Sequence, residues 1–181
     1  MRRRTRAILI VLFSALVSHV VFIYAFPYLV SISSYLRTRG EVRTNEVYYQ
    51  APIDASFKKV VRPCPDILYS ACVYDISECD LLIEAKVPNF TYWSVAFYSI
   101  STDNYFTVND RALSGRASII LTTKERYAKY YANLQGSGGT IYVVSPGTRG
   151  IVIFRIFIPD ESLLPELMEY QRSIKCTPIK R

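Results

Sequence analysis

Residues 7–36 read AILIVLFSALVSHVVFIYAFPYLVSISSYL and contain no charged side chain. Four arginines lie within the six residues before this stretch, and Arg37 ends it. The hydrocarbon core of a bilayer is roughly 30 Å thick, and a helix rising about 1.5 Å per residue crosses it in about 20 residues. The segment from Ala7 to Phe26 has that length before Pro27 is reached. The stretch therefore predicts one transmembrane helix, to which the rest of the chain is attached.

This apolar stretch is typical of an uncleaved signal-anchor. A cleaved signal peptide has an apolar core of about 7 to 15 residues, followed by small residues at the cleavage site. Here the apolar core is longer, and it ends in the bulky residues Tyr24, Phe26 and Tyr28, which we expect at the far membrane interface. His19, in mid-span, is either a tolerated neutral residue or a contact to a partner helix.

Charge and cysteine content predict the orientation. The positive-inside rule places the arginine-rich tail in the cytoplasm, although Arg37, Arg39 and Arg43 flank the other end and make the bias narrow. Four cysteines in a strand-rich domain favour an oxidising space outside the cytoplasm. We therefore predict a cytoplasmic basic tail at 1–6, the transmembrane anchor at 7–36, a polar stalk at 37–45 and a β-rich extracytoplasmic domain at 46–181.

The net charge of +7 lies at the two ends of the chain. Between Thr44 and Ile174 there are 12 basic and 14 acidic side chains, so the body of the domain is nearly neutral. Nucleic-acid binding has little support from this distribution, whereas basic residues beside an anionic lipid surface are ordinary. About 140 residues beyond the anchor are enough for one domain with its own hydrophobic core.

The domain has the pattern of a mainly β protein. Short runs rich in β-branched and aromatic residues, separated by proline, aspartate, serine and glycine, predict eight or nine strands, and two stretches predict helices. We expect a β-sandwich or jelly-roll-like domain with two short helices, and a hairpin around the turn at 77–80. Expected strands are 47–49, 57–61, 67–74, 81–87, 92–100, 105–108, 117–121, 140–144 and 151–158; expected helices are 124–134 and 162–174, with Ser162 as N-cap.

The run RPCPDILYS at 62–70 resembles the R-P-N-P-D-T-L-Y-S box of domain-of-unknown-function family 1254. Similar segments follow at 73–77, 92–98, 102–106, 108–111, 145–150 and 158–160, so the resemblance covers nearly the whole domain. It implies a β-sandwich of unestablished biochemical role. It also implies a short membrane-anchored bacterial branch, hence a single pass through the inner membrane, a periplasmic domain and a sister domain of the same family as a possible partner. Cys64 replaces the asparagine of the box and Cys72 replaces a small residue.

The domain lacks the residues that several kinds of catalytic and metal sites require. His19 is the only histidine, so the domain has none for Ser-His-Asp or Cys-His catalysis or for an imidazole zinc site, and we expect neither a metal nor a cofactor. The cysteine spacing does not match a metal knuckle. Disulfides are the expected alternative, with four free thiols as the competing interpretation; the candidates are Cys64, Cys72, Cys79 and Cys176.

Carboxylates remain for acid-base chemistry. Asp66, Asp75, Asp103 and Asp110 lie between predicted strands, where aspartate commonly forms turns or caps. Two of them in one cleft would suit a carboxylate-dependent hydrolase of sugar or phosphate esters. We keep this as the alternative function.

Aromatic and polar residues favour a binding surface. Strand alternation places Tyr92, Ser94, Ala96 and Tyr98 on one face of their strand, and Trp93, Val95 and Phe97 on the other. One face must be core, and the other could stack a sugar-like or lipid-like ligand. The rigid proline loop 62–70 would hold further contacts. The candidate binding residues are Arg62, Asp66, Tyr69, Tyr92, Tyr98, Asn104, Asn109 and Asp110.

These observations favour a membrane-anchored periplasmic binding module, or an accessory subunit of an envelope complex. The expected partners are the lipid bilayer and a membrane or periplasmic protein, and not nucleic acid. The hydrolase requires two of the aspartates to meet in one cleft, whereas the accessory subunit requires a stable protein partner.

Overall fold

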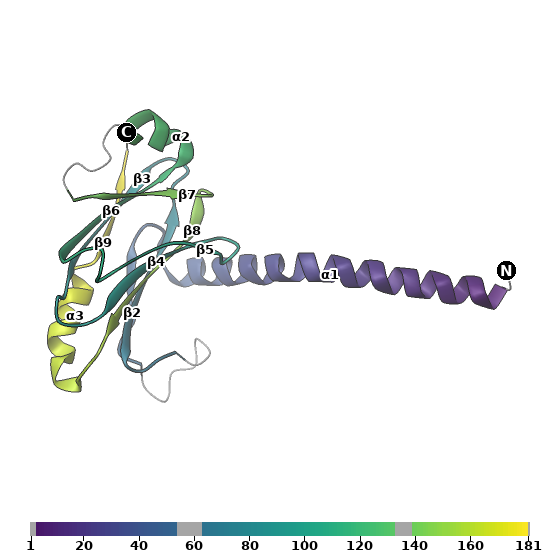
Figure 1. The fold of residues 1–181 in the computed structure, drawn as a ribbon, viewed down its shortest axis with the longest axis horizontal. Helices are drawn as coiled ribbons and strands as arrows, with labels where there is room; N and C mark the ends of the chain where they lie inside the picture. Colours follow the sequence, from purple (N-terminus) through teal and green to yellow (C-terminus); the bar gives the residue numbers. More distant parts are fainter. Residues whose placement is uncertain (1–2, 54–62, 133–138, 181) are drawn as a thin grey trace.

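The apolar stretch forms one long helix. The computed structural model describes residues 3–53, 63–132 and 139–180, and α1 runs from Arg3 to Glu41 (Figure 1). Its part from Arg3 to Val30 is long and apolar enough to cross a membrane, a test that a signal sequence also passes. The helix continues through Pro27 and Gly40, so only residues 42–46 separate it from the first strand. The predicted polar stalk is therefore mostly helical, because a long helix tolerates a single glycine at a cost of about 1 kcal/mol.

Two β-sheets form the domain beyond α1. Sheet A has the strand order β1-β2-β8-β4-β5, and sheet B has the order β7-β6-β3-β9. The described strand pairs are antiparallel except β6 with β7, which are parallel. The strands are β1 (Val47–Tyr49), β2 (Ile67–Asp75), β3 (Asp80–Val87), β4 (Trp93–Ser99), β5 (Asn104–Asn109), β6 (Gly115–Thr123), β7 (Ile141–Ser145), β8 (Arg149–Phe157) and β9 (Lys175–Ile179).

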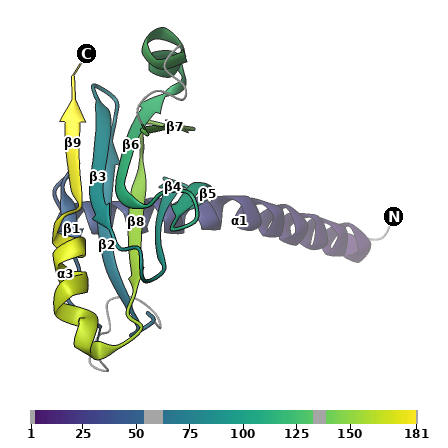
Figure 2. The same cartoon turned by 60° about the vertical axis from the view of Figure 1, so that its left-hand side comes forward.

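The sheets pack face to face, and sheet A is the layer nearer to α1. Both views place sheet A between sheet B and the helix (Figures 1 and 2). The predicted mainly β sandwich with short helices is therefore confirmed. If α1 crosses a bilayer, the outer face of sheet A is the face on the membrane side.

Strand alternation builds the core. Trp93, Val95 and Phe97 point from β4 into the space between the sheets, and each is at most 2% exposed. Leu81 and Ile83 of β3 meet them from sheet B. Burying a large apolar side chain contributes about 1.5–3 kcal/mol, so this two-sided core supplies the main stabilisation of the domain. The predicted division of β4 into a core face and an outer face is correct.

The described part of the domain also contains four short helical segments: α2 (Lys124–Arg126), η1 (Tyr127–Tyr131), η3 (Glu161–Leu163) and α3 (Leu164–Arg172). They match the two predicted helical stretches, and Pro165 lies in the first turn of α3 as expected. The cap is Asp160 rather than the predicted Ser162, because the Asp160 carboxylate accepts a 2.8 Å hydrogen bond from the Ser162 N–H. Gln171 of α3 donates to the carbonyls of Gln50 and Tyr69 and so ties this helix to β1 and β2.

Two strand-level predictions are wrong. The turn at 77–80 does not form a hairpin, because β2 belongs to sheet A and β3 to sheet B, so the chain crosses between the sheets there. Strand β9, which forms an edge of sheet B, was not predicted, since its KCTPI sequence lacks a strand-like apolar pattern. The predicted strand at 57–61 lies outside the described residues.

Candidate functional site

The outer face of sheet A carries most of the predicted binding residues that the structure describes. Cross-strand pairing places Tyr69 opposite Arg155, and Arg155 opposite Ser94, which in turn lies opposite Asn109. All four have the parity opposite to the core residues Val95 and Phe154, so they lie on the outer face. Since adjacent strands are about 4.8 Å apart, these residues form one continuous row across β2, β8, β4 and β5. We call this set the Arg155 row.

Tyr98 and Asn104 lie on the same face, toward the opposite end of β4, and are also a cross-strand pair. A shift of register after Phe97 leaves Tyr105 as the extra residue of β5, and Tyr105 packs against the core. Four predicted binding residues from three separate strands thus share one face, namely Tyr69, Tyr98, Asn104 and Asn109.

The other predicted binding residues lie at one end of this face. Asp66 precedes β2, Tyr92 precedes β4 and Asp110 follows β5, and antiparallel pairing brings these strand ends together with the end of β8. The Phe157 N–H donates to the Tyr92 carbonyl, and the Ile158 N–H donates to the Asp66 carbonyl. All three side chains are exposed. Arg62 lies outside the described residues.

Arg155 is the residue of this face that the sequence-based prediction missed. Its side chain is half-buried at the centre of the sheet, since β8 has β2 on one side and β4 on the other. Its guanidinium donates one hydrogen bond, of 3.1 Å from Nη2 to the Tyr98 hydroxyl. In the described part of the chain it forms no ion pair with a carboxylate. The sequence signal was its place as a single charge within the apolar run GIVIFRIF.

Tyr98 reaches Arg155 by lying along the sheet. Tyr98 pairs with Ile151, four residues before Arg155 in β8, so its ring must extend along the outer face for the hydroxyl to reach the guanidinium. Ala96, between Tyr98 and Ser94 on this face, is only 1% exposed. The small side chains of Ala96 and Ser94 thus leave room on the outer face for the large side chains of Tyr98 and Arg155.

Ser94 is the most unusual polar residue of the row. It is 1% exposed, and its Oγ has no hydrogen-bond partner in the part of the chain that the structure describes. A buried hydroxyl that finds no partner costs about 1–3 kcal/mol. Among the described residues Ser70 Oγ and Trp93 Nε1 are buried without a partner as well, but Ser94 is the one that belongs to the Arg155 row. Its two cross-strand neighbours, Arg155 and Asn109, are both polar.

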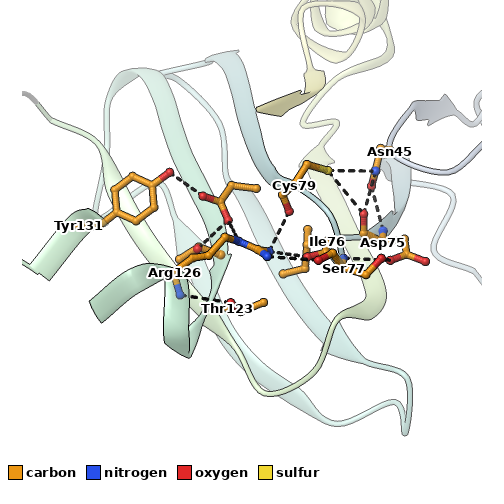
Figure 3. Close-up of polar contacts among 10 residues, drawn as sticks. Asn45, Asp75, Ile76, Ser77, Cys79, Thr123, Arg126 and Tyr131 are labelled. Carbon is orange, nitrogen blue, oxygen red and sulfur yellow. Dashed lines mark hydrogen bonds and ion pairs between the residues drawn. The ribbon is translucent and has the colours of Figure 1, made fainter. Parts of the chain in front are cut away.

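A second polar cluster lies at the crossing between the sheets and is structural. The Asp80 side chain is fully buried and accepts hydrogen bonds from Thr122 (2.7 Å), Arg126 (2.6 Å) and Tyr131 (2.7 Å). Arg126 also donates to the carbonyls of Ile76, Ser77 and Cys79 (Figure 3). The cluster therefore fastens α2 and η1 to the crossing between β2 and β3.

Asn45 and Asp75 connect the end of α1 to the same crossing. The Asn45 side chain exchanges two 2.9 Å hydrogen bonds with the Asp75 backbone (Figure 3). Burial tends to raise the pKa of Asp75, but hydrogen bonds from Ser77 and the Arg149 guanidinium, 2.8 Å away, outweigh it and lower the pKa. Asp75 is therefore a charged structural residue.

The aspartates named for a hydrolase have separate environments. Asp75 pairs with Arg149, and Asp103 accepts a 2.5 Å hydrogen bond from Ser101 in the turn between β4 and β5. Asp66 and Asp110 are exposed at the other end of sheet A. Within the described residues no two of these carboxylates share a hydrogen-bonding partner, and no His, Cys, Asp and Glu group that could hold a metal ion occurs.

The cysteines are thiols, and two of them meet in the core. Cys72 of β2 is fully buried, and Cys176 of β9 packs against the same core from the other sheet. A hydrogen bond between the two thiols, together with burial, raises the pKa of Cys176 well above its ordinary value. Cys72 therefore meets Cys176 and not Cys79, whose Sγ lies instead 3.9 Å from the Asp75 carbonyl oxygen. Cys64 is exposed.

The family comparison matches this domain closely. A model of the proteins of unknown function DUF1254 covers residues 44–178, which is most of the chain and contains all the described strands except for Ile179, the last residue of β9. The chain belongs to this DUF1254 family. The predicted resemblance is thus confirmed, and membership in this family brings no assigned activity. No curated protein matches the chain.

Solved structures share the fold of this DUF1254 chain. The VPA0106 protein from Vibrio parahaemolyticus superposes with a TM-score of 0.65 at 11% identity, over 88% of this chain and 40% of its own. An uncharacterised protein from Burkholderia cenocepacia gives a TM-score of 0.51 at 15% identity, over 76% of this chain and 36% of its own. The chain thus spans about two fifths of these larger proteins. At such identities the likeness concerns the fold alone.

Proposed function

We propose that the chain is a membrane-anchored binding module of the bacterial envelope, whose ligand or partner contacts the outer face of sheet A. The observation that carries the proposal is the convergence of Tyr69, Tyr98, Asn104 and Asn109 on one face, on the side of the molecule from which α1 leaves (Figure 2). Aromatic rings beside amide groups suit a ligand with both apolar and hydrogen-bonding surface.

Site-specific photo-crosslinking in cells tests this proposal. A photoreactive residue at the exposed Asn104 on the outer face of sheet A should give a discrete adduct with a ligand or partner. The matched control is the same residue at Lys86, which is exposed on β3 of sheet B. Adducts of equal yield at both positions, or none at Asn104, would contradict the proposal. A protein adduct would favour the accessory-subunit form, with a sister domain of the same family as one expected partner.

The location belongs to the same proposal: α1 is an uncleaved single-pass anchor in the inner membrane, with the N-terminus in the cytoplasm and the sandwich in the periplasm. The length of α1 and the arginines before it support this arrangement. Exposed Cys64 provides a direct test. A membrane-impermeant maleimide should label intact cells, and Cys64→Ser should abolish the labelling. Labelling that requires lysis would place the domain in the cytoplasm.

An oxidising periplasm would join Cys72 to Cys176. The two thiols lie in the same core, and the hydrogen bond between them that raises the pKa of Cys176 supports this pairing. Such a disulfide would close a loop of roughly 100 residues and stabilise the fold by about 4–5 kcal/mol in the chain-entropy model. It would link sheet A to sheet B through their shared core.

A further inference from the structure

We infer that the Arg155 row is an oxyanion-binding site, which takes a phosphate or carboxylate group between the Arg155 guanidinium and the Ser94 hydroxyl. The inference rests on the proposed function, because it names the ligand chemistry of the same face of sheet A. It comes from two independent observations, both made among the described residues: a half-buried guanidinium without a carboxylate and a buried hydroxyl without a partner, directly opposite each other.

The guanidinium is the first observation. Arg155 has five N–H donors, of which the structure uses one, toward Tyr98. The other buried or half-buried arginine network shows the usual solution, since Arg126 holds the Asp80 carboxylate and three backbone carbonyls. Arg155 has no such partner in the described part of the chain. Its planar fork matches two oxygens of a phosphate or carboxylate, and this pairing is stronger than one between neutral groups.

The hydroxyl is the second observation. Ser94 of β4 lies opposite Arg155 of β8 and is 1% exposed. Its Oγ has no hydrogen-bond partner among the described residues. An oxyanion held by the guanidinium would accept a hydrogen bond from the Ser94 Oγ–H, which requires the Arg155 side chain to shift from its position beside Tyr98. Apolar packing alone would be served better by alanine, which occupies the next outer position of the same strand at Ala96.

Aromatic and amide side chains around Arg155 add further ligand-binding surface to the site. Tyr69 on β2 and Tyr98 on β4 provide aromatic surface beside Arg155, and Asn109 is the next residue across from Ser94. Among the described residues, the carboxylates Asp66 and Asp110 lie at the strand ends beyond the row and are exposed, so water and salt screen them. The geometry therefore fits a ligand with one anionic group and an apolar or sugar-like body.

Two sources could present such an anion, and the test separates them. Full-length protein in neutral detergent micelles is titrated with inorganic phosphate against sodium chloride of equal ionic strength. In parallel, nanodiscs of phosphatidylcholine alone are compared with nanodiscs that also contain phosphatidylglycerol. The readout is the NMR signal of the Arg155 Nε–H, assigned by its loss in Arg155→Gln, together with the unfolding temperature. A saturable response in micelles indicates a soluble anion, and one confined to phosphatidylglycerol indicates a lipid headgroup.

Three variants complete the test. Arg155→Gln lacks the Nε–H signal and is followed by the unfolding temperature. It should raise the half-saturating anion concentration by about tenfold or more, as expected for loss of a charge-assisted bidentate contact. Arg111→Gln removes an exposed arginine next to Asp110 and should leave the half-saturating anion concentration unchanged. Ser94→Ala should raise the half-saturating anion concentration severalfold without lowering the unfolding temperature of the anion-free protein. This separates a ligand contact from a structural role.

The inference is overturned if neither arm gives a saturable response, or if Arg155→Gln and Ser94→Ala bind as the wild type does. If a crosslink at Asn104 were found together with such a result, the proposed binding module would still be supported, and only the proposal of an anionic ligand would be rejected. Absence of both the crosslink and the anion response would remove the two together.

Discussion

Gly150 has no room for a side chain. A Cβ at this position in β8 would overlap the carbonyl oxygen of Tyr98 and the hydroxyl of Tyr74. That hydroxyl also contacts Tyr105 at 2.9 Å and Ser145 at 3.0 Å, so it is held from several sides and cannot move freely. Glycine is therefore required here for space, and its backbone conformation is ordinary.

Gly150→Ala should accordingly destabilise the domain at or above the upper end of the roughly 1–3 kcal/mol that overpacking costs. The matched control is Gly147→Ala in the preceding turn, where an added Cβ meets nothing within 4 Å. The single tryptophan, Trp93, is buried in the core, so its fluorescence reports unfolding of the full-length protein in detergent. Equal unfolding midpoints for the two variants would refute the steric argument.

Asp75 should make stability depend on pH in the acid range. Its folded pKa is lowered below the ordinary 3.8, so the stabilisation is fully present above that value and is lost as the pH falls through the lowered folded pKa. Asp75→Asn should be less stable than the wild type at pH 7, and the two should converge in strong acid. Urea unfolding midpoints measured at several pH values check this. A constant difference at all pH values would show that the charge of Asp75 is not responsible.

At the scale of single residues, the sequence predicts faces better than roles. Trp93 and Tyr98 were assigned to opposite faces of β4 by alternation alone, and the structure agrees. The role of Arg155 depends on which residues lie opposite it on β2 and β4, segments more than 50 residues away along the chain. Since strand order is a property of the whole fold, no local pattern could have brought Arg155, Ser94 and Tyr69 together.

Among the elements, the short helical segment α2–η1 depends on one buried ion pair. Arg126→Met would leave the Asp80 carboxylate buried without its charge partner, which typically costs about 3–5 kcal/mol. Arg116→Met breaks a comparable pair with Glu84, but Arg116 is 71% exposed, and such surface pairs contribute about 0–1 kcal/mol. Thermal unfolding followed by Trp93 fluorescence compares the two variants.

The double variant Asp80→Asn with Arg126→Met sharpens this comparison. It removes both charges, so it should recover part of the stability that Arg126→Met loses. Equal stability of the single and double variants would mean that the lost hydrogen bonds to the carbonyls, and not the unpaired charge, dominate the effect.

Strand order also limited what could be predicted for the elements. The turn at 77–80 has ordinary turn residues and two strand-like neighbours, which locally favours a hairpin. Contacts far away in sequence decide otherwise, because β2 pairs with β8 and β3 pairs with β6. Strand β9 contains Pro178, which lacks an N–H, and an edge strand tolerates such a residue where an interior strand would not.

For the whole molecule, the Cys72–Cys176 contact predicts a redox-dependent stability. Protein isolated from cells with thiols blocked, then denatured without reductant, should show Cys64 modified and Cys72 and Cys176 protected until reduction. Reduction should then lower the unfolding midpoint of the folded protein, because the closed loop is opened. Cys176→Ser should show the lower midpoint under both conditions. Complete labelling of Cys72 and Cys176 without reductant would contradict the disulfide.

The attachment of α1 at Asn45 determines how the domain would respond to mechanical pull. Asn45 adopts a left-handed φ of 62°, which asparagine tolerates better than most residues, and its N–H donates a 2.7 Å hydrogen bond to the Val73 carbonyl of β2. The adjoining strand β1 also pairs with β2 along residues 47–49. A force transmitted along α1 would therefore load the hydrogen bonds that join Asn45 and β1 to β2, the strand that lies between β1 and β8 in sheet A. The link between α1 and the domain is thus held at its first residue by β2 itself, before the edge strand β1 begins.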